Sequence, residues 1–265
     1  MNYLIPGLLL LFSCVFGYAD QRNQPNLKVT KSSPQTLAAT TTSTSADELT
    51  NAPAEKVNDP FERINRSTFR LNDSLTIHVA KPVARTYEHL VPHKVRTAVS
   101  NFFYNLDFPV RFANDVLQGR IKRSGQEVSM FIINTTAGIA GFIRVSDHVP
   151  TLVDVPPEDF GLTLARWGFS PGPYMVVPVL GPSTIRDSVG LGGDFALNPL
   201  NWYQLGVFAH NYIPTWANYT LGGARVISGL PGGVRTYEQM KETAIDPYIA
   251  VRNAYLSHRA AQLQK

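Results

Sequence analysis

The acidic pair Glu158-Asp159 and the carboxylate of Asp187 are the side chains of this sequence best suited to acid/base chemistry. Two carboxylates held beside one bond could donate and remove a proton. However, Glu158-Asp159 is better explained as the N-terminal cap of a helix that follows it. The sequence also contains no Walker-A loop, no Gly-x-Ser-x-Gly elbow and no His-Glu-x-x-His motif. We therefore expect a protein that is not an enzyme.

Metal and cofactor sites are equally hard to assemble from these residues. The six histidines are dispersed, and Pro92 interrupts any continuous helix between His89 and His93. The segment Gly190-x-Gly192-Gly193 lacks the full dinucleotide-binding pattern. The net charge of +4 is scattered and forms no basic stripe of the kind that binds nucleic acid. We expect no metal, no cofactor and no nucleic-acid partner.

The only cysteine of the chain, Cys14, lies in a short apolar N-terminal run typical of a signal peptide. Leu11-Phe12-Ser13-Cys14 resembles a bacterial lipobox, in which the signal ends at Ser13 and Cys14 becomes the lipid anchor. Gly17-Tyr18-Ala19 instead resembles an ordinary signal-peptidase site, which would give a signal over residues 1–19 and discard the cysteine. Both interpretations stay open.

Residues 20–57 are expected to form a disordered linker, because a tract dense in Ser and Thr between Ser32 and Ser45 cannot offset its ordering entropy by burial. Residues 58–265 then form the folded domain. Apolar residues recur at helical spacing after Asp59-Pro60, where Asp59 and Glu62 suit a capping box. The pattern predicts a mainly α-helical domain of amphipathic helices. After the first helix, further helices are expected over residues 82–90, 92–106, 109–119, 122–137, 215–228, 234–243 and 246–262.

The middle of the domain is broken by proline, and the prolines between residues 149 and 181 exclude a long helix. Residues 174–177 are expected to be extended, and Pro182 is expected to open a helix that contains Arg186 and Asp187.

A stretch without Asp, Glu, Lys or Arg runs from Phe195 to Ala224 and is rich in large aromatic residues. Trp and Tyr collect at membrane interfaces, where charges are costly. Pro199 and Pro214 exclude one spanning helix, so the segment is interpreted as lying in one leaflet, with an aromatic-rich globular core as the alternative. The expected interface residues are Trp202, Tyr203, Tyr212, Trp216 and Tyr219.

Ordered motifs along the body resemble the MlaA (VacJ) family of outer-membrane lipoproteins. They include Asn58-Asp59-Pro60-x-Glu62-x-x-Asn65-Arg66, Lys81-Pro82-Val83-Ala84, Phe131-x-x-Asn134-Thr135, Glu158-Asp159-Phe160-Gly161, Gly172-Pro173-Tyr174, Gly181-Pro182-Ser183 and Asp246-Pro247-Tyr248. The resemblance implies a ring-like helical domain embedded in the inner leaflet of the outer membrane, on its periplasmic face. It also implies a central amphipathic channel that removes misplaced phospholipids from the outer leaflet. The implied partners are phospholipid, an outer-membrane porin and a soluble periplasmic lipid-binding carrier.

Two groups of residues are then expected near the lipid path. Gly172, Pro173 and Tyr174 are interpreted as part of a loop at the channel mouth, or otherwise as a tight turn. Of the neighbours Arg186 and Asp187, one would meet the lipid phosphate or pore water while the other pairs with a neighbouring helix. The alternative is an ion pair that orients the helix. The alternative function is a passive scaffold of the envelope, and a periplasmic hydrolase is a third interpretation.

Overall fold

The computed structural model describes residues 59–153, 155–204, 215–242 and 244–264. Its helices are α2 (Glu62–Leu75), α3 (Lys81–Leu90), α4 (His93–Leu106), α5 (Phe108–Leu117), α6 (Ile121–Thr136), α7 (Phe160–Arg166), α8 (Ile185–Leu197), α9 (Pro199–Gln204), α10 (Thr215–Glu242) and α11 (Pro247–Leu263). A π-helical turn, η2 (Thr76–Ala80), joins α2 to α3, and a 3₁₀ turn, η3 (Val145–His148), follows α6. Two short antiparallel strands, β1 (Tyr174–Val177) and β2 (Gly181–Thr184), form a hairpin with Tyr174 opposite Thr184.

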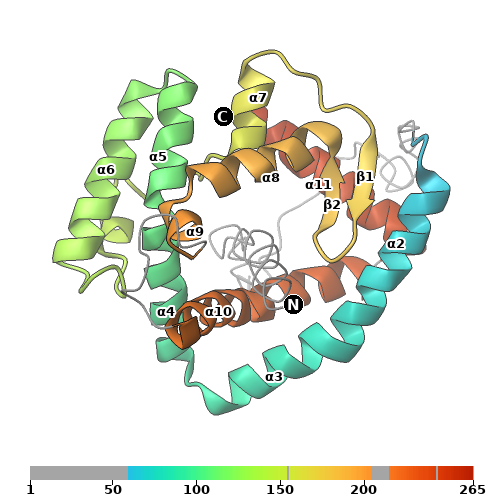
Figure 1. Ribbon diagram of the computed structural model, residues 1–265, viewed down its shortest axis with the longest axis horizontal. Helices are drawn as coiled ribbons and strands as arrows, with labels where there is room; N and C mark the ends of the chain where they lie inside the picture. The colour runs from blue at the N-terminus through green and yellow to red at the C-terminus, as the bar shows by residue number, and fades with distance from the viewer. Residues whose placement is uncertain (1–58, 154, 205–214, 243, 265) are drawn as a thin grey trace, which may run out of the picture.

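The elements are arranged around a ring (Figure 1). Helices α2 and α3 form one curved arm, α10 packs along the inner side of α3, and α5 and α6 form a second pair. Helix α8 packs on α7 and leads into α9 beside α5, while α11 contacts α7 and β2. The expectation of a mainly helical, ring-like domain is confirmed. Within the residues searched, no helix has the length and hydropathy needed to span a membrane.

Among the described residues, apolar packing is divided among three small clusters around this ring. Ala80 and Ala84 pack against Leu230 and Val234 of α10. Met130 of α6 packs against the loop that contains Leu152 and Val155. The hairpin residues Tyr174 and Val176 pack against Tyr248 of α11. Within the part of the chain that the structure describes, these clusters stay separate, because each element of the ring packs mainly against its neighbours.

The local signals of the sequence mostly act as expected. Asp159 caps α7 by accepting a hydrogen bond from the Leu162 backbone N–H at 2.8 Å. Gly119 follows α5 with a φ of +71°, the left-handed conformation that favours glycine at a helix end. Residues 174–177 are extended, as predicted.

Asp59 does not cap the first helix, so that prediction is wrong. Helix α2 begins at Glu62 without a side-chain cap. The Asp59 carboxylate instead accepts hydrogen bonds from Asn65 at 2.9 Å and from the Tyr248 hydroxyl, and it pairs with Arg252. A buried carboxylate needs such partners more than an exposed helix start needs a cap.

Two further helix boundaries differ from the prediction. Pro182 lies inside β2, and α8 begins only at Ile185, capped by Thr184. A two-stranded hairpin tolerates proline because each strand has a free edge. Helix α10 is one helix that continues through Pro231 where two were expected, and its packing through Leu230 and Val234 spans the proline.

Candidate functional site: a polar frame inside an apolar ring

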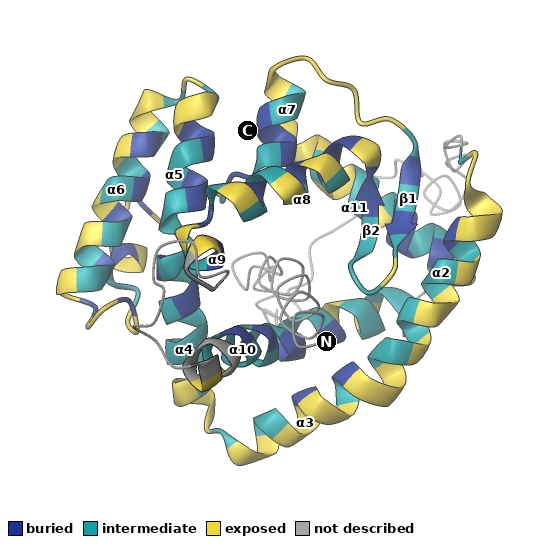
Figure 2. Cartoon of the chain, in the orientation of Figure 1, coloured by how far each residue is buried: buried dark blue, intermediate teal, exposed yellow. Residues whose placement is uncertain are grey.

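The distribution of polar and apolar side chains is inverted relative to an ordinary soluble domain. Among the described residues, 21 polar or charged residues are buried, against 15 apolar ones. At the same time 24 large hydrophobic residues are exposed, and they occur on nearly every helix of the ring. Figure 2 shows the exposed residues along the outer sides of α2, α3 and α6. A polar interior within an apolar surface indicates contact with lipid.

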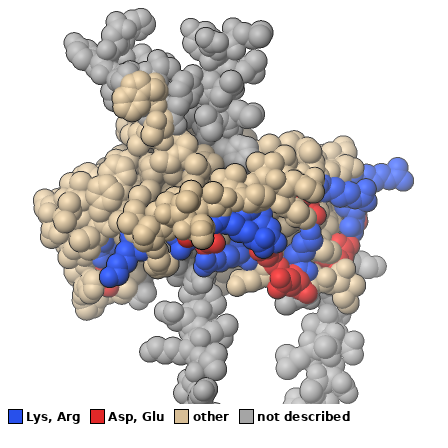
Figure 3. Space-filling model, turned by 90° about the horizontal axis from the view of Figure 1, so that it is seen from below, with Lys and Arg blue, Asp and Glu red and all other residues tan. Residues whose placement is uncertain are grey.

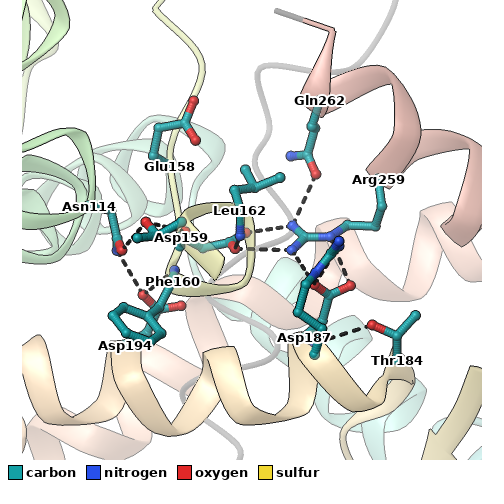
Figure 4. Close-up of polar contacts among 12 residues, drawn as sticks. Asn114, Glu158, Asp159, Phe160, Leu162, Thr184, Asp187, Asp194, Arg259 and Gln262 are labelled. Carbon is teal, nitrogen blue, oxygen red and sulfur yellow. Dashed lines mark hydrogen bonds and ion pairs between the residues drawn. The ribbon is translucent and has the colours of Figure 1, made fainter. Parts of the chain in front are cut away.

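The centre of the buried polar frame is Arg259 of α11 (Figure 4). Its Nη1 lies 2.6 Å from Asp159 Oδ2, and its Nη2 lies 2.8 Å from Asp187 Oδ1. Asp159 caps α7 and Asp187 lies in the first turn of α8, so both carboxylates also meet the positive ends of helix dipoles. One guanidinium therefore connects the C-terminal helix to the starts of two others.

Asp187 is the most heavily bonded carboxylate of this frame. Besides Arg259, it accepts hydrogen bonds from the Tyr255 hydroxyl at 2.7 Å and from Arg186 Nε at 3.1 Å. Burial alone would raise the pKa of Asp187, but the hydrogen bonds and charge of Arg259, with Tyr255 and Arg186, outweigh it and lower the pKa to about 2. The carboxylate is therefore ionised at any physiological pH.

A second buried group links α5 to α7 and α8. Asp194 accepts hydrogen bonds from Asn114 and from the Phe160 backbone N–H, both at 2.9 Å. Asn114 in turn accepts from the Thr163 hydroxyl at 2.8 Å. Burial raises the pKa of Asp194, and the nearby Asp159 raises it further. Figure 4 shows both groups side by side along α8.

A third cluster of charges lies between α5, α6 and the loop before α7. Glu158 pairs with Arg120 at 2.7 Å and with Arg123 at 2.6 Å. Asp115 lies 3.4 Å from Arg123. Burial raises the pKa of Asp115 to about 7, since Arg123 offsets only part of the cost and the charges of Glu127 and Glu158 add to it.

Glycines allow α7 and α8 to approach closely enough to build the frame. A Cβ on Gly190 would lie 2.5 Å from the Gly161 backbone nitrogen, and one on Gly193 would lie 2.3 Å from the Phe160 ring. A Cβ on Gly161 would come within 2.7 Å of Asp187 and Arg259. These glycines therefore set the contact between the two helices, and they serve no phosphate-binding loop.

The residues expected near a lipid path have the following places. Arg186 and Asp187 are both buried and bonded to each other, with 3.0 Å between Arg186 Nη2 and Asp187 Oδ1. Gly172 has a φ of +66° and leads through Pro173 into the hairpin, where the Pro173 carbonyl accepts a hydrogen bond from the Ile185 N–H at 3.4 Å. Tyr174 is buried among aromatic residues of α11. The structure thus brings all five to the hairpin and the start of α8.

The aromatic residues expected at a membrane interface are only partly described. Trp202 on α9 and Trp216 on α10 are exposed, the latter by 69%. Tyr203 and Tyr219 lie on the same two helices, but their side chains fall outside the described part of the chain. Tyr212 and Cys14 also fall outside it.

Sequence reasoning missed Arg259, which organises the frame. Its two partners lie 100 and 72 residues away, so no local pattern points to it. Asp159 was expected to act as a cap, and it does so while also binding Arg259. In the part of the chain that was searched, no group of three or more His, Cys, Asp and Glu residues could hold a metal ion.

A helical ring with an apolar outer surface and a polar buried frame is the architecture of a protein whose surface contacts lipid. Residues 57–262 match the family model described as MlaA lipoprotein. A Shigella flexneri protein called intermembrane phospholipid transport system lipoprotein MlaA is 32% identical over 196 residues, which cover 72% of each chain. An uncharacterised Rickettsia felis protein is 33% identical over 207 residues, 75% of each chain.

The fold comparison agrees with the sequence comparison. A solved structure described as the structural basis for maintenance of bacterial outer membrane lipid asymmetry superimposes with a TM-score of 0.60 at 30% identity. The match covers 76% of this chain and 96% of the other. This chain belongs to the MlaA lipoprotein family.

Proposed function

We propose that this protein acts in the intermembrane phospholipid transport system that maintains the lipid asymmetry of the outer membrane. In this proposal the ring lies in the inner leaflet, on the periplasmic face of the outer membrane. Misplaced phospholipids leave the outer leaflet through an amphipathic channel in the ring and pass to a soluble periplasmic lipid-binding carrier. An outer-membrane porin is the partner that supports the ring.

The observation that carries the proposal is the inverted side-chain distribution. The 24 exposed large hydrophobics are spread from Phe61 on the N-terminal side of α2 to Leu263 on α11. In water such a surface would be costly, whereas in a leaflet it replaces contacts between acyl chains.

The buried polar frame supports the same role in a second way. Its ion pairs join α11 to the starts of α7 and α8, and a hydrogen bond from Asn114 to Asp194 joins α5 to α8, so the ring can keep its shape while lipid surrounds it. A phospholipid in transit needs polar surroundings for its headgroup and apolar cover for its tails. A ring open to the periplasm could offer both, while the driving free energy would come from elsewhere.

The N-terminal part completes the proposal. Residues 1–19 would be the signal, or would end at Ser13 if Cys14 is the lipid anchor, and residues 20–57 would tether the domain of residues 58–265. Within the domain, Gly172, Pro173 and Tyr174 would shape the channel mouth. The exposed Trp202 and Trp216, together with Tyr203, Tyr212 and Tyr219, would lie at the membrane interface.

A membrane-fractionation experiment tests whether the ring itself is embedded in the membrane. Cys14→Ala is combined with an efficient ordinary signal, so that no acyl chain is attached. The proposal expects the folded protein to stay in the membrane fraction through its apolar surface. Recovery of all of it as soluble periplasmic protein would contradict this.

A transfer assay separates transport from a passive scaffold. The protein is reconstituted with fluorescent phospholipid in one leaflet, and the label that reaches a periplasmic lipid-binding carrier is measured. Transport predicts transfer above the rate of protein-free vesicles, whereas a scaffold leaves that rate unchanged. Release of fatty acid or headgroup from the same labelled lipid would instead indicate a hydrolase.

A further inference from the structure

Although the basic residues are scattered over the chain as a whole, four of them recur at one angular position along the outer arm formed by α2, η2 and α3. Arg63, Arg70, His78 and Arg85 are all exposed and are separated by seven, eight and seven residues. Seven residues are almost two complete turns of an α-helix, so residues at this spacing lie on one side. The one extra residue falls where the π-helical turn η2 (Thr76–Ala80) widens the helix, which keeps the series in line. We call these four residues the basic edge.

The arginines of the basic edge have no ion-pair partner in the described part of the chain. The acidic residues of the same arm already have partners, because Glu62 pairs with Arg66, Asp73 with Lys241 and Glu88 with Arg96. The arm therefore presents uncompensated positive charge toward its surroundings. An exposed arginine presents a planar donor fork that suits phosphate oxygens.

A parallel apolar edge accompanies the basic edge. Ile64, Leu71 and Val79 each follow a basic-edge residue by one position, which is about 100° around the helix. Val83 and Leu90 continue the series on α3, and all five side chains are exposed. Figure 3 shows this side of the ring, with Lys and Arg, and Asp and Glu among them, gathered below a band of uncharged residues. The arm thus has one apolar and one cationic border.

We propose that the basic edge binds the headgroups of anionic phospholipids in the leaflet that surrounds the ring. The inference rests on the proposed function, in which the ring is embedded in one leaflet, and it adds a preference for anionic phospholipid. With the apolar edge among acyl chains, the basic edge lies at the level of the phosphates, where each cation gains from a negatively charged surface. Anionic lipid complements both edges, because its headgroups pair with the basic edge and its acyl chains cover the apolar edge. A soluble partner bound to the basic edge would leave the adjoining apolar edge in water.

Vesicle binding by the full chain tests the proposal. Flotation is measured with vesicles of phosphatidylcholine alone and with vesicles that contain 30% phosphatidylglycerol, on the order of a bacterial anionic content. The parent should bind the anionic vesicles more tightly, and salt should reduce the difference. Arg70→Gln/Arg85→Gln should lose roughly 25-fold in affinity for anionic vesicles, about fivefold for each cation, and keep its affinity for neutral ones.

Two matched variants control the experiment. Lys122→Gln/Arg166→Gln removes the same charge from exposed positions on α6 and α7, away from the arm, and should bind nearly as the parent does. Arg70→Lys/Arg85→Lys keeps the charge and should retain most of the affinity.

Equal losses in the two Gln variants, or a parent without preference for anionic vesicles, would overturn the proposal while leaving transport intact. If the parent protein binds neither kind of vesicle, the ring does not enter the membrane, and the proposed function is overturned as well.

Discussion

Replacing Asp187 with asparagine removes one charge from the buried frame and keeps the shape of the side chain. Asp187 accepts hydrogen bonds from Arg259, Tyr255 and Arg186, and these lower its pKa from an ordinary 3.8 to about 2. Each pKa unit corresponds to 1.36 kcal/mol, so the ionised form stabilises the folded state by about 2 kcal/mol at neutral pH. For a domain of roughly 200 residues, the loss of this stabilisation in Asp187→Asn should lower the melting temperature by about 4–9 °C.

The dependence on pH distinguishes this electrostatic account from simple loss of packing. Because the folded-state pKa is lowered, the contribution is complete above about pH 4 and is lost as the pH falls through about 2. The difference between Asp187→Asn and the parent should therefore shrink by roughly half at pH 3. Melting is measured in one detergent at pH 7 and at pH 3.

A surface variant provides the control. Asp147 pairs with Arg144 at 3.1 Å, but its side chain is 40% exposed. Asp147→Asn should therefore cost no more than about 0.5 kcal/mol. The reasoning fails if the two variants melt alike, or if the deficit of Asp187→Asn is the same at both pH values.

Four further variants test the packing, the buried charges and the turn before the hairpin. Gly190→Ala puts a Cβ 2.5 Å from the Gly161 nitrogen and should lower the stability by roughly 1–3 kcal/mol. In the control Gly192→Ala the new Cβ has nothing within 4 Å, so this variant should be neutral or more stable by up to about 1 kcal/mol. Equal melting temperatures of the two variants would count against close packing of α7 and α8. Asp115→Asn should stabilise the protein above pH 7 by on the order of 4 kcal/mol, because a raised pKa makes ionisation costly in the folded state, and the gain should vanish toward pH 4. A gain that persists at pH 4 would exclude that cause. Gly172→Val should lower stability by roughly 1–2 kcal/mol, since its φ of +66° disfavours a β-branched residue, and an unchanged melting curve would contradict this.

Much of the helical fold could be predicted because the deciding signals are local. Apolar spacing located α4, α5 and α6 to within about two residues, a usual uncertainty for helix ends. Gly119 and Asp159 marked a helix end and a helix start through their own backbone preferences.

The errors arise where tertiary contacts outweigh a local preference. Asp59 has the spacing of a cap, but its carboxylate binds Tyr248 and Arg252 on α11. Pro231 has the appearance of a helix break, yet the packing of α10 against η2 and α3 extends on both sides of it. Neither contact is encoded within a short window of sequence.

In the candidate site, too, some residues can be identified from local sequence and others cannot. Asp187 can be singled out from the sequence because it lies in a region with few charges, and an ion pair that orients its helix is one of the two roles the sequence predicts. Arg259 could not be identified from the sequence, because it looks like any arginine near a helix end until the fold brings α7, α8 and α11 together.

The central claim is that this protein removes misplaced phospholipid from the outer leaflet of the outer membrane. The most direct measurement is the amount of phospholipid in that leaflet, determined by surface labelling of intact cells of a deletion strain. The account predicts that phospholipid accumulates in the outer leaflet and returns to the parental amount when the intact gene is restored. An outer leaflet with the same phospholipid content in deletion and parental strains would contradict it.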